Sequence, residues 1–264
     1  MKVREALAAA AIDARDARLL LAEVAGVSVA RIAASPDEDV PFEVEQAFLA
    51  LAARRRTGEP VAYLLGRKEF YGLDLLVSPE VLVPRPETEL LVELALERCP
   101  ASVLDLGTGS GAIALAIKRH CPASRVLATD ISARALEVAR QNAGRLGLDV
   151  EFREGALYAP VGGERFALVV SNPPYVAEGD PHLPALRFEP RSALTGGPDG
   201  LEVIRDLVLG APAHLLAGGE LLIEHGQGQE DPVCAMLKAA GFRDIRSWPD
   251  LAGIARVSGG RLES

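Results

Sequence analysis

The tetrapeptide Asn172-Pro173-Pro174-Tyr175 holds the residue types in this sequence that are best suited to chemistry. It directly follows the apolar run 168–171, so it should lie at the carboxyl end of a buried strand, where open α/β sheets bind their ligands. A given four-residue sequence of this kind arises by chance about once in a thousand chains of this length. A double proline also makes a rigid turn, but a reaction site is the more specific interpretation.

An amide or aromatic amine nitrogen is a poor nucleophile, because its lone pair is delocalised into the neighbouring π-system. A site for such a nitrogen must hold the NH₂ group in line with a methyl donor and accept both N–H bonds. The Asn172 side-chain oxygen and the Pro173 carbonyl supply two acceptors at a fixed separation. Tyr175 supplies a flat face that also favours a nearby sulfonium. We therefore expect Asn172, Pro173 and Tyr175 to act in catalysis, and all four residues, with Pro174, to bind a planar substrate.

A glycine-rich loop, Gly107-Thr108-Gly109-Ser110-Gly111, connects the apolar run 103–106 to a predicted helix. Glycines allow a tight turn and the close approach of a ligand, and the helix N-terminus offers free N–H donors. Asp130 ends a second predicted strand, 19 residues after Gly111, where a carboxylate can accept hydrogen bonds from ribose hydroxyls. These features predict a nucleoside cofactor without naming it, since Gly107-x-Gly109-x-x-Ala112 also meets the relaxed dinucleotide fingerprint.

Strands and helices alternate from residue 102 onward. Continuous apolar strands separated by helices imply a parallel sheet that is covered on both faces. The predicted strands are 102–106, 125–129, 150–153, 166–171 and 220–224, and the predicted helices are 111–120, 133–146 and 201–215. Segments 245–248 and 254–257 would add two more strands.

Residues 1–57 predict a small domain of short helices. Asp13 suits the N-cap of one helix, and residues 41–56 have the apolar spacing of a helix with one buried face. The side chains expected to be buried are Leu20, Leu21 and Val24 in the first of these helices and Val44, Ala47, Phe48 and Leu51 in the second.

Residues 58–86 predict a hairpin linker between this domain and a catalytic domain at 87–264. The apolar runs 61–65 and 70–77 are broken by Gly66 and Gly72, as in two strands joined by a turn. The catalytic domain should then begin with a helix near residue 88.

Composition narrows the class of protein. The chain has 264 residues, 28 of them basic and 37 acidic, for a net charge of −9 and a pI of about 5.1, which argues against binding to duplex nucleic acid. No apolar run approaches the roughly 18 residues of a membrane span, and the charged N-terminus lacks the apolar core of a signal peptide. We expect a cytoplasmic protein, and take it to be a monomer. Cys99, Cys121 and Cys234 lack zinc-site spacing, so we expect reduced structural thiols and no metal site.

Further segments resemble the bacterial HemK/PrmC family, the glutamine methyltransferases of class-1 peptide release factors. The resemblance extends over most of the chain and includes segments that a nucleoside-binding fold does not require. These are Tyr63-Leu64-Leu65-Gly66, Glu69-Phe70-Tyr71-Gly72, Val83-Pro84-Arg85-Pro86-Glu87-Thr88-Glu89, Glu189-Pro190-Arg191-Ser192-Ala193-Leu194 and Gly196-Gly197-Pro198-Asp199-Gly200-Leu201, besides the glycine loop and residues 171–175.

The resemblance implies an α/β, class I (Rossmann-like) S-adenosylmethionine methyltransferase with an N-terminal helical domain that helps to recognise the release factor. It implies methyl transfer to the side-chain amide nitrogen of the glutamine in the Gly-Gly-Gln motif of that factor, leaving S-adenosylhomocysteine. By position in the family, residues 107–111 and Asn172 line the cofactor site, Asp130 binds the ribose, and Leu157 lies beside the adenine. Many relatives have an aromatic residue at the Leu157 position.

Several alternatives stay open. An adenine amino methyltransferase acting on DNA or RNA would suit the same tetrapeptide, although the net charge of −9 and the flanking segments oppose it. A nicotinamide-dependent oxidoreductase, or a non-catalytic module that binds release factors, would leave the tetrapeptide unused. The run Arg54-Arg55-Arg56 is interpreted either as a docking site or as the cationic end of a helix. Glu189-Pro190-Arg191 either orders a substrate loop or forms a surface turn.

Overall fold

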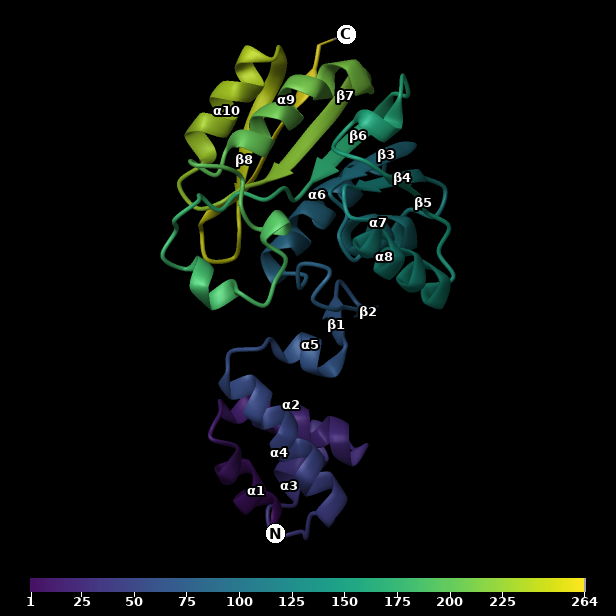
Figure 1. Cartoon of the computed structure of the whole chain (residues 1–264). Helices are drawn as coiled ribbons and strands as arrows, with labels where there is room; N and C mark the ends of the chain where they lie inside the picture. Colours follow the sequence, from purple (N-terminus) through teal and green to yellow (C-terminus); the bar gives the residue numbers. More distant parts are fainter. Residues whose placement is uncertain (264) are drawn as a thin grey trace. The chain divides into compact units, whose positions relative to one another are not determined.

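The protein folds as two compact units, Met1–Arg67 and Lys68–Ser264. Its structure, a computed structural model, describes residues 1–263. Across that part of the chain, no helix combines the length and apolar character needed to cross a membrane. The first unit is helical and the second contains the main sheet (Figure 1).

The first unit consists of five helices around one apolar core. They are α1 (Val3–Ala10), α2 (Ala14–Ala25), α3 (Val29–Ala34), α4 (Phe42–Arg56) and α5 (Val61–Leu65). The predicted N-cap of α2 is confirmed, since the Asp13 carboxylate accepts the backbone N–H groups of Arg15 and Asp16. Leu20 and Leu21 are fully buried in the core of this unit, as predicted.

The buried face of α4 differs from the predicted one at one edge. Phe48 and Ala52 are fully buried and Val44 and Leu51 are partly buried, but Ala47 is exposed. The apolar stripe therefore runs along the other side of Phe48, and the single methyl group of Ala47 costs little to leave in water.

Residues 61–65 form helix α5, so their prediction as a hairpin strand is wrong. Pro60 fixes the backbone at the start of the helix, and Gly66, in the left-handed conformation with φ 69°, ends it. Tyr63 is buried, which a run of five residues cannot indicate by periodicity alone. The hairpin follows instead, as β1 (Arg67–Phe70) and β2 (Leu73–Leu76).

The arginine run at the end of α4 makes contacts within the helical unit. Arg54 pairs with a glutamate in the following turn, and Arg55 Nε lies 2.8 Å from Asp16 Oδ2. Arg56 donates a hydrogen bond of 2.7 Å to the carbonyl oxygen of Ala10. These contacts join the end of α4 to other parts of the unit and support the structural interpretation of the run.

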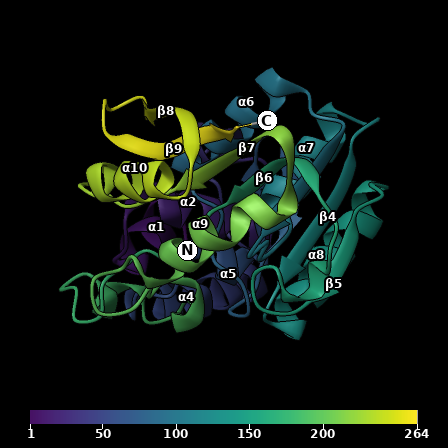
Figure 2. The ribbon, with the colours of Figure 1, turned by 90° about the horizontal axis from the view of Figure 1, so that it is seen from above.

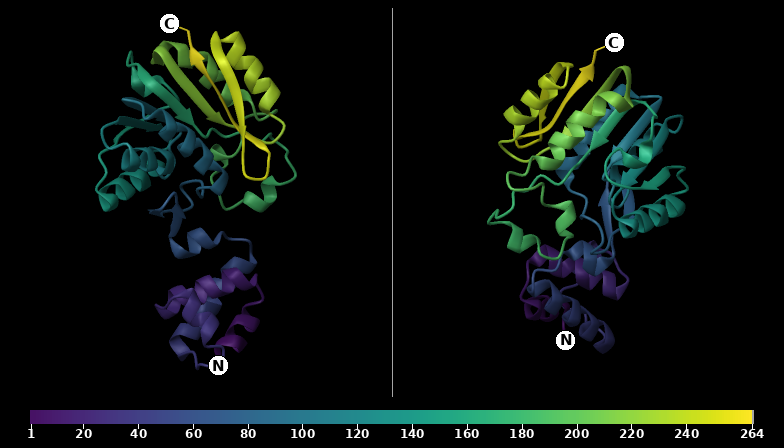
Figure 3. Two further views of the ribbon diagram at one scale, coloured as in Figure 1. Left: turned by 180° about the vertical axis from the view of Figure 1, so that it is seen from behind. Right: turned by 45° about the horizontal axis from the view of Figure 1, so that its top comes forward.

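The second unit contains a seven-stranded sheet in the order β5-β4-β3-β6-β7-β9-β8. The first five strands of this order are parallel, and β9 and β8 are antiparallel additions at one edge (Figure 3). The strands are β3 (Ser102–Leu106), β4 (Arg125–Asp130), β5 (Glu151–Glu154), β6 (Phe166–Ser171), β7 (Leu215–Glu224), β8 (Phe242–Pro249) and β9 (Ala255–Leu262). The predicted parallel sheet and its two extra strands are confirmed.

Helices cover both faces of this sheet (Figure 2). Side chains alternate along each strand, so Val103 packs toward α6, α7 and the end of α8, while Leu104 packs toward α9 and α10. The helices are α6 (Glu89–Arg98), α7 (Ala112–His120), α8 (Ala133–Leu146), α9 (Glu202–His214) and α10 (Glu230–Ala239), with 3-10 turns η1 (Pro86–Thr88), η2 (Ala159–Val161), η3 (Leu183–Leu186) and η4 (Arg191–Ala193). The sequence patterns did not predict α10.

The three cysteines are free thiols, as expected. Cys99 and Cys121, which end α6 and α7, nevertheless lie with their sulfur atoms 3.3 Å apart. Their separation along the chain gave no sign of this contact.

A buried amide joins three parts of the second unit. The Asn142 side chain, on α8, is fully buried; its Nδ2 donates to the carbonyl oxygens of Leu76, at 3.0 Å, and Ser110, at 2.9 Å. Its Oδ1 accepts the backbone N–H of Leu76 at 2.7 Å. One side chain thus holds β2 of the hairpin and the glycine loop against the same helix.

We predict that Asn142→Ala lowers the free energy of unfolding by about 2 to 4 kcal/mol, because it leaves buried backbone groups without partners. The measurement is urea denaturation, with Gln141→Ala, an exposed amide on the same helix, as the matched control. Equal stability of the two variants would show that the Asn142 amide does not hold these segments.

Candidate active site

The predicted cofactor and substrate residues lie at or just beyond the ends of four neighbouring strands. β5, β4, β3 and β6 are adjacent and parallel, so their carboxyl ends lie at one edge of the sheet. The long connection from β6 to α9 lies beyond the ends of β6 and β7 (Figure 1). A cavity of about 360 Å³ at this edge is lined by Gly107, Gly109, Asp130, Leu157, Asn172 and Pro174, among others.

The other predicted site residues support the cavity from outside its lining. Thr108 Oγ1 donates to Asp105 Oδ2 at 2.6 Å, and Gly111 N donates to the Thr108 carbonyl at 2.9 Å. The Ser110 carbonyl is held by the buried amide of α8. Pro173 is buried, and the Tyr175 ring packs against the core on the α9 and α10 side.

Two glycines form an open cradle in the loop after β3. Gly107 and Gly109 have φ values of 74° and 56°, and a Cβ added to either would meet no atom within 4 Å. The backbone of the loop is therefore exposed to the cavity, where a ligand can approach it closely.

A buried carboxyl supports this cradle from below. Asp105 is fully buried and accepts the Thr108 hydroxyl and the Ala114 N–H, while its Oδ1 has no hydrogen-bond partner among the described residues. Burial raises the pKa of Asp105 to about 7, against the lowering effect of these two hydrogen bonds. Asp105 therefore stays protonated to a higher pH than an exposed aspartic acid does.

Asp130 joins the glycine loop to the end of β4. Its Oδ2 accepts the N–H of Gly109 at 2.8 Å, and its Oδ1 accepts the N–H of Ser132 at 2.9 Å. Burial raises its pKa above the usual value, against the effect of these hydrogen bonds. Each carboxylate oxygen keeps a second lone pair, so hydroxyl groups of a ligand can still be bound.

The lining of the cavity is acidic and apolar. Among the described residues that form it, Glu80, Asp130 and Asp206 are the charged side chains, and none is Lys or Arg. Ile131 and Leu157 supply apolar surface, and Ile131 is 67% exposed. Such a lining favours a ligand with a positive charge and a flat apolar part.

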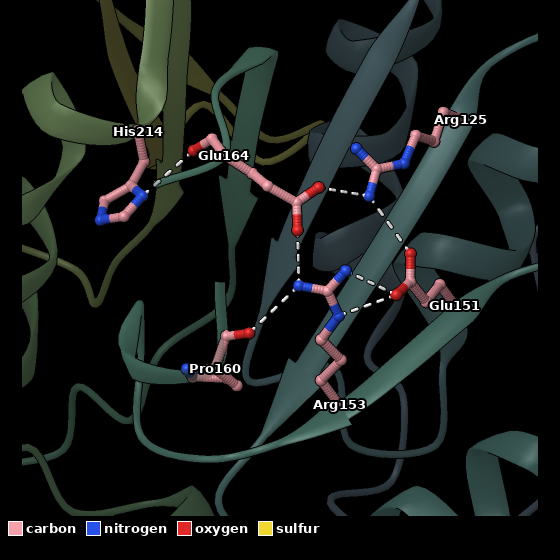
Figure 4. Close-up of polar contacts among 6 residues, drawn as sticks. All are labelled: Arg125, Glu151, Arg153, Pro160, Glu164 and His214. Atoms are coloured by element: carbon pink, nitrogen blue, oxygen red, sulfur yellow. Dashed lines mark hydrogen bonds and ion pairs between the residues drawn. The ribbon is translucent and has the colours of Figure 1, made fainter. Parts of the chain in front are cut away.

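The loop that carries Leu157 is fixed by a polar network at the sheet edge (Figure 4). Arg153 contacts Glu151 and Glu164 at 2.6 Å, and it also donates to the Pro160 carbonyl at 3.1 Å. In the same loop, the Tyr158 ring stacks on the ring of His214, with centroids 4.6 Å apart. Leu157 itself has a φ of 45°, which the surrounding contacts maintain.

Close backbone contact holds the tetrapeptide. A Cβ on Gly196 would overlap the carbonyl oxygen of Pro174, and one on Gly200 would overlap that of Tyr175. Gln229 also fixes the tetrapeptide backbone, because its Nε2 donates a hydrogen bond of 3.0 Å to the Tyr175 carbonyl oxygen. The glycine segment 196–200 therefore serves to position the tetrapeptide, a role that spacing along the chain did not reveal.

Glu189 ties the segment before η4 to the segment before η1. Its buried carboxylate accepts the N–H of Val83 at 3.1 Å and pairs with Arg85. Pro190, Ser192 and other residues of the same segment line the cavity. These contacts support the interpretation of this motif as an ordered loop of the site.

Two residues at the site were missed as functional candidates. Asn172 Nδ2 donates to Thr88 Oγ1 at 3.0 Å, and the Tyr175 hydroxyl lies 3.4 Å from Oε1 of Glu224, a residue only 1% exposed. The signal for Glu224 was a carboxylate at the carboxyl end of a predicted strand whose interior, 221–223, is apolar. Thr88 was noted only as the start of a helix.

Comparisons with known proteins agree with this architecture. Residues 86–187 match the model of the methyltransferase small domain, and residues 1–66 match that of the PrmC N-terminal domain. A release factor glutamine methyltransferase of Burkholderia pseudomallei is 50% identical over 98% of this chain and 95% of its own.

Solved structures share the fold at low sequence identity. A methyltransferase from Pyrococcus furiosus is 19% identical, with a TM-score of 0.61 over 80% of this chain and 100% of its own. The 16S rRNA methyltransferase RsmC of T. thermophilus, in complex with AdoMet and guanosine, is 19% identical, with a TM-score of 0.54 over 75% of this chain and 50% of its own.

We predict that Gly196→Ala lowers methyl transfer at least about 100-fold, because the added methyl group displaces the Pro174 carbonyl and the tetrapeptide with it. The measurement is kcat with saturating substrates. Gly163→Ala is the matched control, since a Cβ at Gly163 meets no atom within 4 Å. An active Gly196→Ala protein would mean that the tetrapeptide tolerates this displacement.

We also predict a specific pH dependence of stability from Asp105. Its pKa is about 7 in the folded protein and about 4 when unfolded, so its contribution to stability is full below pH 4 and is lost as the pH rises through 7. The unfolding free energy of the wild type minus that of Asp105→Asn should therefore fall by about 2.6 kcal/mol between pH 5 and 8. Urea denaturation measures this difference, with the exposed Asp149→Asn as control; a flat difference would contradict the assignment.

Proposed function

Because the chain belongs to the family of release factor glutamine methyltransferases, we propose that it transfers a methyl group from S-adenosylmethionine to a glutamine side-chain amide nitrogen of a release factor. The observation that carries the proposal is that Gly107 and Gly109 of the glycine cradle line the same cavity as Asn172. At the finer level, we take the acceptor to be the glutamine of the Gly-Gly-Gln motif in class-1 factors.

The residues of the cavity fit S-adenosylmethionine. The cradle of Gly107 and Gly109 would hold the amino acid part, Asp130 the ribose hydroxyls, and Ile131 and Leu157 the faces of the adenine. The cofactor carries a net positive charge, which suits the acidic lining, whereas the two negative charges of a nicotinamide dinucleotide pyrophosphate do not. When bound, S-adenosylmethionine supplies an electrophilic methyl group on its sulfonium.

The tetrapeptide is proposed to hold the acceptor nitrogen. With Nδ2 engaged by Thr88, the remaining polar atom of the Asn172 side chain is Oδ1, an acceptor for one N–H of the substrate amide. The Pro173 carbonyl would accept the other N–H. Holding both fixes the nitrogen in the geometry that its weak nucleophilicity requires. The proton would then leave to water, once methylation has made the nitrogen acidic.

The Tyr175 ring has a different proposed role from the one its sequence position indicates. Its ring packs on the core and its hydroxyl faces Glu224, so Tyr175 anchors the tetrapeptide to the core. We therefore assign Tyr175 to positioning and leave the substrate contact to Asn172, Pro173 and Pro174. The helical domain, matched as a PrmC N-terminal domain, is proposed to recognise the release factor.

Labelled S-adenosylmethionine offered with purified release factors tests this function directly. We expect label on the wild-type factor, none on a factor whose motif glutamine is changed, and none on adenine-containing duplexes. Asn172→Ala should lose at least about 100-fold in kcat, because an acceptor for the substrate N–H is gone. Calorimetric titration should show that this variant still binds S-adenosylmethionine.

Gln141→Ala, which removes an exposed amide that does not line the cavity, is the matched control and should retain wild-type activity. Label on the duplex in place of the release factor would overturn the proposed substrate. A wild-type rate for Asn172→Ala would instead overturn the role of the asparagine.

A further inference from the structure

The orientation of the Asn172 amide is not fixed by Thr88 alone. An amide presents a donor NH₂ at one end and an acceptor oxygen at the other, and a threonine hydroxyl both donates and accepts. Thr88 could therefore bond either end of Asn172 equally well. The observed contact, from Asn172 Nδ2 to Thr88 Oγ1 at 3.0 Å, requires the hydroxyl proton of Thr88 to point elsewhere.

Glu224 is the buried carboxyl that can accept that proton. It ends β7, next to the strand that carries the tetrapeptide, and its side chain is almost fully buried. Its Oε1 faces the Tyr175 hydroxyl at 3.4 Å, and its Oε2 is buried without a hydrogen-bond partner among the described residues. The hydroxyl of Thr88 lies close enough to lower the pKa of this carboxyl, and it is a rotatable donor that can serve Oε2.

We propose that Glu224 is a positioning residue that orients the Asn172 amide through Thr88. The carboxylate accepts the Thr88 proton, Thr88 Oγ1 then accepts from Asn172 Nδ2, and Asn172 Oδ1 is left to accept from the substrate amide. This inference rests on the proposed function, because it concerns how the acceptor nitrogen is held. It gives a positioning role to Thr88 and Glu224, which do not themselves line the cavity.

The charge state of Glu224 sets the direction of the hydrogen bonds that would link Glu224, Thr88 and Asn172. A carboxylate only accepts, so the direction of the hydrogen bonds is fixed; a carboxylic acid also donates, so the direction is no longer fixed. Burial, the largest cause, and Glu87 raise the pKa of Glu224, the Thr88 and Tyr175 hydroxyls and Arg256 lower it, and the result is a pKa of about 7. Tyr175 keeps its own proton, because burial and Glu224 raise its pKa. Activity should therefore fall as the pH drops below about 7.

The first experiment compares Thr88→Ser with Thr88→Val in the full-length protein, using a release factor and labelled S-adenosylmethionine. Serine keeps the hydroxyl and should keep kcat within about threefold of the wild type, whereas valine keeps the shape and should lose about 10- to 100-fold. The KM for S-adenosylmethionine should change less than threefold in both. Gln141→Ala, which removes an exposed amide outside the cavity lining, is the control and should behave as the wild type.

The second experiment is the pH profile of kcat for Glu224→Gln. We expect a reduced kcat and loss of the acid limb near pH 7 that the wild type shows. This experiment compares the shapes of two pH profiles of kcat and does not use a Thr88 variant. It therefore tests the role of Glu224 even if Thr88→Val fails to fold. Equal kcat for the serine and valine variants, or an unchanged acid limb in Glu224→Gln, would overturn the inference. A wild-type protein that methylates no release factor would instead overturn the proposed function.

Discussion

An asparagine amide can accept a hydrogen bond from a substrate only if its oxygen faces the substrate, and the proposed role of Asn172 depends on that requirement. Asn172 is held at its nitrogen end by Thr88, which begins the second unit's first long helix, and Glu224 stands behind Thr88 at the end of β7. The three residues come from segments far apart in the sequence. Only a sheet whose strands end at one edge brings them together.

On the cofactor side of the cavity, carboxyl groups also hold neighbouring groups in place by accepting hydrogen bonds. Asp105 and Asp130 accept N–H and hydroxyl groups of the glycine loop, and each loses solvation to do so. Their hydrogen bonds give the loop a defined shape while Gly107 and Gly109 stay open to a ligand. The loop is therefore preorganised by the protein, so that ordering it does not have to be driven by ligand binding.

The sequence predicted the parts of the molecule that depend on neighbouring residues. Strand 102–106 and strand 166–171 are bounded as predicted, since mainly apolar runs end there before a glycine segment and a proline segment. Residues 61–65 were assigned wrongly because five residues are too few to separate helix from strand. Thr88 and Glu224 were missed for another reason: their roles depend on contacts between distant segments, which no local pattern contains.

The glycine segment 196–200 has a consequence for how such an enzyme can evolve. Gly196 and Gly200 are fixed by the carbonyl oxygens they approach rather than by any ligand. No substitution within the tetrapeptide removes a backbone carbonyl oxygen, so a side chain at either glycine could be accommodated only by moving the tetrapeptide backbone. We therefore expect both glycines to be retained while the cavity walls vary, so that a new acceptor specificity is easier to acquire by altering the walls.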